Sequence, residues 1–144
     1  MASPVLDSFA LLVFLFKEKG YQKVVDVFEQ AAESDQAACM AAPNWAEVRY
    51  IIQRKVGVQR WGEVRSTVLA LPLQVVAADQ ALAEAAGALK ASKKMSLADC
   101  FAVARAPQAR ASACTAQRPC RWRALSAAPV CRPVPDSARS ARIL

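Results

Sequence analysis

The sequence predicts an α/β fold, in which helices cover both faces of a short parallel sheet in three layers (α/β/α). Short, continuously apolar segments alternate with amphipathic segments of helical length along the first 104 residues. Strands that are apolar on both faces are typical of parallel sheets covered by helices. The chain has 144 residues, 55% of them hydrophobic, which is enough for about one domain with its own core.

Three apolar segments are the expected strands. VLD at residues 5–7 and QAACMA at residues 36–41 are short and apolar, and LPLQVVAAD at residues 71–79 is rich in Val and Leu. RASACT at residues 110–115 is the remaining place for a fourth strand, but its composition supports a strand poorly. We therefore expect a sheet with three strands, and a doubtful fourth strand at residues 110–115.

Six helices are expected between and after these strands. Pro43 suits the first turn of a helix, and Gly57 ends that helix. Asp79 is interpreted as a helix cap, and Ser96 with Asp99 three residues later forms a capping-box arrangement. The expected helices cover residues 9–18, 22–32, 44–55, 60–70, 80–90 and 96–106.

The charge of the chain is unevenly distributed. Residues 1–104 carry 11 Lys and Arg against 11 Asp and Glu, whereas residues 105–144 hold the excess that gives a net charge of +7. This C-terminal part lacks the apolar periodicity of the preceding residues. Its composition fits a disordered basic segment, or an out-of-frame translation of GC-rich DNA, which the abrupt change favours. We place a domain at residues 1–106 and an Arg/Pro/Ala-rich tail at residues 107–144, as the degraded end of the domain or a disordered segment.

Composition excludes several kinds of chemistry. The chain has no His, which excludes His general acid–base chemistry and every Ser–His or Cys–His nucleophile. Cys39 and Cys100 lie in apolar stretches and are expected in the core, whereas Cys114, Cys120 and Cys131 lack the C-x2-C spacing of a zinc site. Any catalysis here must therefore rely on carboxylates.

The apolar runs are too short for a membrane span. None reaches the ~18 residues that a transmembrane helix needs. Asp7 stands where a signal peptide would have basic residues. We therefore expect a cytoplasmic protein without a membrane partner.

Three acids lie in apolar surroundings near expected helix starts. They are Asp7 in VLDSFALL, Glu47 in NWAEVRY and Asp99 in SLADCFA. Each alone has an ordinary explanation, as a helix cap for Asp7 and as a favourable contact with the helix dipole for the other two. If they converge, the carboxylates repel one another, and a bound divalent cation removes that conflict. Mg²⁺ or Mn²⁺ suits such oxygen ligands.

Four segments in order give the chain a family resemblance. VLDSFALL, NWAEVRYIIQRK, LPLQVVAADQALAEAAGALKA and MSLADCFA resemble the PIN-domain ribonuclease toxins of the VapC family over residues 3–106. The resemblance implies a PIN-like α/β/α domain and Mg²⁺-dependent (or Mn²⁺-dependent) hydrolysis of RNA phosphodiester bonds. It further implies the toxin role in a type II toxin–antitoxin system.

The resemblance also assigns roles to individual residues. It implies that Asp7 and Asp99 bind the metal ion and that Glu47 completes the catalytic acids, by holding a second metal ion or by orienting the attacking water. Ser8 and Asn44 match common polar companions of the same site.

The partners implied by the resemblance are an RNA substrate, a cognate antitoxin protein and a second copy of the chain in a homodimer. RNA would approach the site along basic side chains through phosphate contacts. The candidates for this basic rim are Arg49, Arg54, Lys55, Lys93 and Lys94.

One position departs from the family pattern. The family has a fourth acid in a Thr-Gly-Asp-like turn about 18 residues beyond the acid matching Asp99, and this chain has Gln117 there, after Thr115. An amide supplies no charge to a metal site. An alternative hypothesis is therefore a decayed or frameshifted PIN-domain protein that binds antitoxin or RNA without cleaving it.

Overall fold

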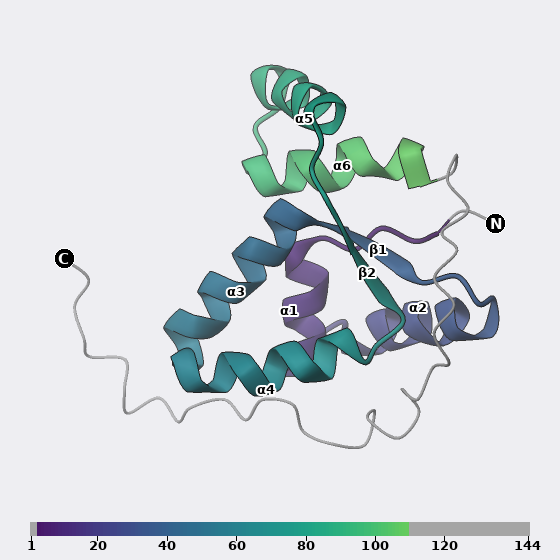
Figure 1. Ribbon diagram of the computed structural model, residues 1–144, viewed down its shortest axis with the longest axis vertical. Helices are drawn as coiled ribbons and strands as arrows, with labels where there is room; N and C mark the ends of the chain where they lie inside the picture. Colours follow the sequence, from purple (N-terminus) through teal and green to yellow (C-terminus); the bar gives the residue numbers. More distant parts are fainter. Residues whose placement is uncertain (1–2, 110–144) are drawn as a thin grey trace.

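The computed structural model describes residues 3–109, and it contains six helices and two strands within that range (Figure 1). The expected fourth strand, Gln117 and the tail beyond residue 109 lie outside the described residues. In chain order the elements are α1 (Ser8–Phe16), α2 (Tyr21–Glu33), β1 (Ala38–Ala41), α3 (Ala42–Val56), α4 (Val58–Leu69), β2 (Leu73–Val76), α5 (Gln80–Ser92) and α6 (Leu97–Ala109).

The sheet is parallel, as the sequence predicts, and it is shorter than expected. β1 pairs with β2 so that Ala38 lies opposite Leu73 and Ala41 lies opposite Val76. All four residues of β1 are buried. β1 begins two residues later than predicted and ends at Ala41 as predicted, directly before helix α3. β2 covers only Leu73–Val76 of the predicted residues 71–79, because the chain then leaves the sheet to reach the start of α5.

The expected first strand is reduced to one parallel bridge, between Val5 and Cys39. The Leu6 N–H donates to the Cys39 carbonyl oxygen at 2.8 Å, and the Cys39 N–H donates to the Pro4 carbonyl oxygen at 2.7 Å. Pairing cannot continue because Asp7 is already the N-cap of α1. The α/β prediction is therefore confirmed, with two strands and a bridge among the described residues in place of three strands.

All six predicted helices are present. α4 begins at Val58, two residues earlier than predicted. Gly57 joins α3 to α4 with φ 91°, a conformation that side chains other than glycine's rarely adopt. The chain therefore reverses from one helix to the next through a single residue. No helix within residues 3–109 is long and apolar enough to cross a membrane.

Two apolar clusters hold the fold together. The larger one joins α1, α2, α3 and α4 to the sheet, and Phe28 is its largest fully buried side chain, in edge-on contact with Phe14 at 5.1 Å between ring centroids. The smaller cluster packs the pair α5 and α6 against the end of β1 (Figure 1). Cys39 and Cys100 are both buried, which confirms their predicted place in the core.

Candidate functional site

Asp7 lies at the start of α1 and caps it. Its Oδ1 accepts a hydrogen bond from the Ala10 backbone N–H at 2.7 Å, while its own backbone is extended. The side chain is half-buried. The charge is tolerated beside apolar residues because the helix start offers an unpaired N–H and the positive end of the helix dipole.

Asp99 lies in the first turn of α6 in the reciprocal capping box that the sequence predicts. The Asp99 N–H donates to the Ser96 Oγ at 3.1 Å, and the Ser96 N–H donates to the Asp99 Oδ2 at 3.3 Å. Within residues 3–109, neither Asp99 nor Asp7 forms an ion pair. Each carboxylate has one oxygen in its cap, and its second oxygen makes no hydrogen bond with a described residue.

Asn44 connects the two helix starts. Its Nδ2 donates to the Ser8 Oγ at 3.1 Å and to the Ala98 carbonyl oxygen at 3.0 Å. Ser8 in turn donates from Oγ to the Asn44 carbonyl oxygen at 3.3 Å. Ser8 directly follows Asp7, and Ala98 directly precedes Asp99. One amide group therefore holds the segments that carry both carboxylates.

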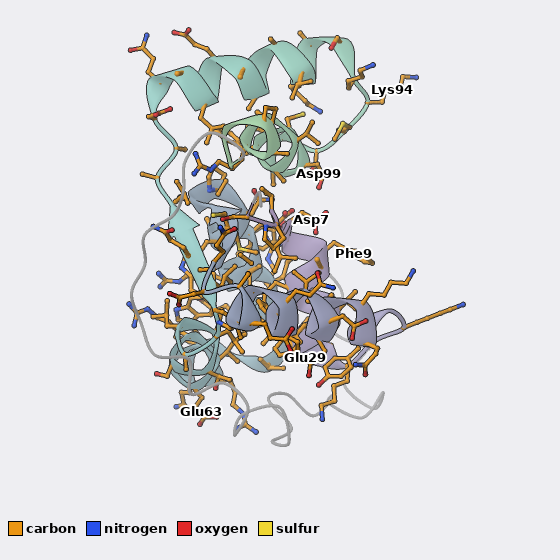
Figure 2. All side chains as sticks on the ribbon, turned by 90° about the vertical axis from the view of Figure 1, so that its right-hand side faces the viewer. Asp7, Phe9, Glu29, Glu63, Lys94 and Asp99 are labelled. Atoms are coloured by element: carbon orange, nitrogen blue, oxygen red, sulfur yellow. The ribbon has the colours of Figure 1, made fainter. Side chains whose placement is uncertain are left out.

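Asn44 is itself the third residue of α3, so three helix starts meet at this point. A helix start carries a partial positive charge of about half an elementary charge. Three of them together favour carboxylates and would favour the anionic oxygens of a phosphate. Figure 2 shows Asp99 and Asp7 following one another along one side of the molecule.

The amide of Asn44 is fully buried but incompletely satisfied. Its Oδ1 has no hydrogen-bond partner among the described residues. A buried acceptor without a donor costs free energy, and in native proteins such an atom often contacts an ordered water or an ion. This unpaired atom lies where the two carboxylate-bearing segments meet.

Glu47 lies one turn further along α3 than Asn44. It is half-buried, and its Oε1 accepts a hydrogen bond from the Tyr50 hydroxyl at 3.4 Å. Within the part of the chain that the structure describes, no three acidic or cysteine side chains gather closely enough to hold a metal ion. Asp7, Glu47 and Asp99 therefore do not form one compact group of three acids.

Comparison with protein families identifies the fold. The profile of the PIN domain matches residues 5–116. The chain belongs to the PIN-domain family. A comparison with curated proteins found no match. The PIN-domain part of the predicted resemblance is thus confirmed, and PIN domains are a nuclease fold whose members generally depend on divalent metal ions.

The basic side chains predicted to form a rim occupy different parts of this PIN domain. Arg49 and Arg54 line a surface hollow of about 310 Å³ along α3, together with Tyr50. Their guanidinium groups lie over aromatic rings, at 5.8 Å from the Trp61 centroid and 5.1 Å from the Tyr50 centroid. These contacts place the two cations on α3, the same helix that carries Glu47.

The remaining rim candidates lie elsewhere. The Lys55 Nζ is 4.6 Å from the centroid of the Phe16 ring. Lys93 and Lys94 are exposed in the connection between α5 and α6, and Figure 2 shows Lys94 beyond Asp99 on the side that carries Asp7. The rim candidates therefore lie in three places, which are the α3 hollow, the ring of Phe16 and the connection between α5 and α6.

Sequence reasoning did not find the hollow. Tyr50 and Gln53 line it, together with Ala46 and Val58. The sequence predicted neither Tyr50 nor Gln53 as a residue of the site or of the basic rim. A signal was present, since residues 46, 49, 50, 53 and 54 share one helical face. That spacing alone does not show whether the face is open or covered, which only packing decides.

Proposed function

We propose that this PIN domain is a Mg²⁺-dependent endoribonuclease, with Mn²⁺ as the alternative ion, that hydrolyses RNA phosphodiester bonds. We further propose that it is the toxin of a type II toxin–antitoxin system in the cytoplasm. The observation that carries the nuclease proposal is the hydrogen bonding of Asn44 to the two segments that present Asp7 and Asp99 within a PIN fold.

The side chains at the three helix starts fit a single Mg²⁺ ion. Mg²⁺ is commonly bound through one or two carboxylates and keeps several waters. Asp7 and Asp99 each keep an oxygen without a hydrogen bond to the described residues, and the unpaired Oδ1 of Asn44 can accept from a coordinated water. A bound Mg²⁺ ion supplies Lewis-acid polarisation of the phosphate and a more acidic water. Asp7 and Asp99 are therefore the proposed ligands.

The chain's other residues have supporting roles in this proposal. We assign Glu47 the orientation of the attacking water, because the three acids do not form one compact group that would hold a second ion. Ser8 and Asn44 position the carboxylate-bearing segments through their mutual hydrogen bonds. The exposed Lys94 near Asp99 supplies a contact for a neighbouring phosphate of the RNA.

The proposed protein partners are a cognate antitoxin and a second copy of the chain. Both rest on the resemblance of four segments to the VapC toxins. Co-purification of the chain with the product of an adjacent small gene tests the antitoxin, and sedimentation of the purified chain tests the homodimer.

One observation favours a non-catalytic second candidate. No three-acid group exists within residues 3–109, and Gln117 occupies the place of the family's fourth acid. In this case the chain binds antitoxin or RNA and does not cleave.

The test uses two Asp→Asn substitutions with matched local geometry. Asp7 and Asp79 are both N-caps, accepting from the third following N–H at 2.7 and 2.8 Å, and Asn is an equally good cap. Asp7→Asn therefore removes a charge at the proposed metal site without removing a cap, and Asp79→Asn does the same at the start of α5, outside the site.

Cleavage of a structured RNA is measured with the full chain in Mg²⁺ and in EDTA. We expect cleavage by the native chain in Mg²⁺ alone, a loss of about 100-fold or more in Asp7→Asn, and unchanged cleavage in Asp79→Asn. RNA binding by the native chain without cleavage, unaffected by EDTA, would establish the non-catalytic alternative. Equal activity of the two variants would show that Asp7 is not a ligand.

A further inference from the structure

Phe9 is an aromatic side chain with no role in the core. It is 67% exposed, whereas Leu11, Val13, Phe14 and the other buried apolar residues of α1 point into the protein. Exposing an aromatic ring to water forgoes the free energy that its burial would supply. The position of Phe9 in the first turn of α1 is thus explained neither by packing nor by helix capping, which Asp7 performs.

Phe9 is close along the chain to one of the proposed metal ligands, Asp7. Phe9 follows Asp7 by two positions, with only Ser8 between them, so their Cα atoms are at most about 7 Å apart. Figure 2 shows Lys94, Asp99, Asp7 and Phe9 following one another along one side of the molecule. A cation, two carboxylates and an exposed aromatic ring therefore succeed one another along this side.

This order matches the chemistry of a single RNA strand. A strand whose scissile phosphate is at the carboxylates places a neighbouring phosphate toward the cation on one side and a base toward the ring on the other. Unpaired bases stack on exposed aromatic side chains, and stacking of this kind contributes strongly to the binding of single strands without requiring a particular base.

We propose that Phe9 is a substrate-positioning residue on which an unpaired nucleobase next to the scissile phosphate stacks. The proposal rests on the proposed ribonuclease function and names its substrate as RNA that is single-stranded at the cleavage site. Phe9 acts by fixing the nucleotide, and it takes no part in the proton transfers or in bond cleavage.

The test separates the base from the backbone. Binding of the full chain is measured in EDTA, so that no strand is cut, to a fluorescent oligouridine and to an abasic ribose-phosphate strand of the same length. Both strands carry the same phosphates, so the contribution of Lys94 and of the eight Arg in residues 105–144 is the same for both. The variants are Phe9→Ala, Phe9→Trp as the conservative change, and Leu69→Ala, which removes another exposed apolar side chain at the far end of α4.

We expect Phe9→Ala to weaken oligouridine binding about tenfold and to leave abasic binding unchanged. Phe9→Trp and Leu69→Ala retain the native preference for the strand with bases. Equal binding of the two strands by the native chain overturns the assignment. A preference for the strand with bases that survives in Phe9→Ala overturns it as well. Cleavage in Mg²⁺ is measured separately. A failure of the nuclease proposal can therefore be distinguished from a failure of the stacking proposal.

Discussion

Replacing Asn44 with Ala should destabilise the fold by about 2 kcal/mol. The change removes the donor to the Ala98 carbonyl oxygen and the donor to the Ser8 Oγ. The carbonyl left without a donor costs about 1–3 kcal/mol, and the lost bond to Ser8, which still donates elsewhere, costs about 1 kcal/mol. Removal of the unpaired Oδ1 and the better helix propensity of Ala offset about 1 kcal/mol of this.

Urea unfolding of the full chain measures this loss. The midpoint should fall while the slope m stays constant, because the change affects stability without altering the surface exposed on unfolding. Gln59→Ala is the control, since it deletes an exposed amide from α4, and its effect should stay within about 0.5 kcal/mol. A loss below about 0.5 kcal/mol in Asn44→Ala would refute the argument that this amide holds the starts of α1 and α6 together.

Three further predictions concern the core and the second carboxylate. Phe28→Ala, at the centre of the larger cluster, should cost about 3–5 kcal/mol in urea unfolding, and a loss under about 1 kcal/mol would contradict its packing. Ser96→Ala should cost about 1 kcal/mol because the Asp99 N–H loses its acceptor; unchanged stability would show that the capping box contributes nothing. Cys39 and Cys100 should resist a thiol reagent in the folded chain and react after unfolding, as peptide mass spectrometry reports, and rapid labelling of either in native buffer would contradict its burial.

Local signals in the sequence determined the helices and their ends. Asp79 caps α5 and Ser96 pairs with Asp99 as predicted, because a cap depends on a side chain and an N–H only three residues apart. Gly57 similarly ends α3. The alternation of apolar and amphipathic segments was sufficient to predict the α/β class. A strand that is buried on both faces is continuously apolar, and this is visible in the sequence.

The carboxylate site required the tertiary structure. The resemblance named Asp7 and Asp99 as metal ligands and Glu47 as the third acid. Packing joins the segments of the two aspartates through Asn44, and the three acids form no compact group among the described residues. Those hydrogen bonds span 36 and 54 residues of chain, and no local pattern encodes such a pairing. The exposure of Phe9 was equally hidden, because an apolar residue at the start of an apolar helix has the same sequence signature whether it faces the core or water. The sequence therefore determined which polar and acidic side chains the chain contains. Only the packing of the starts of α1, α3 and α6 decided which of these side chains lie together.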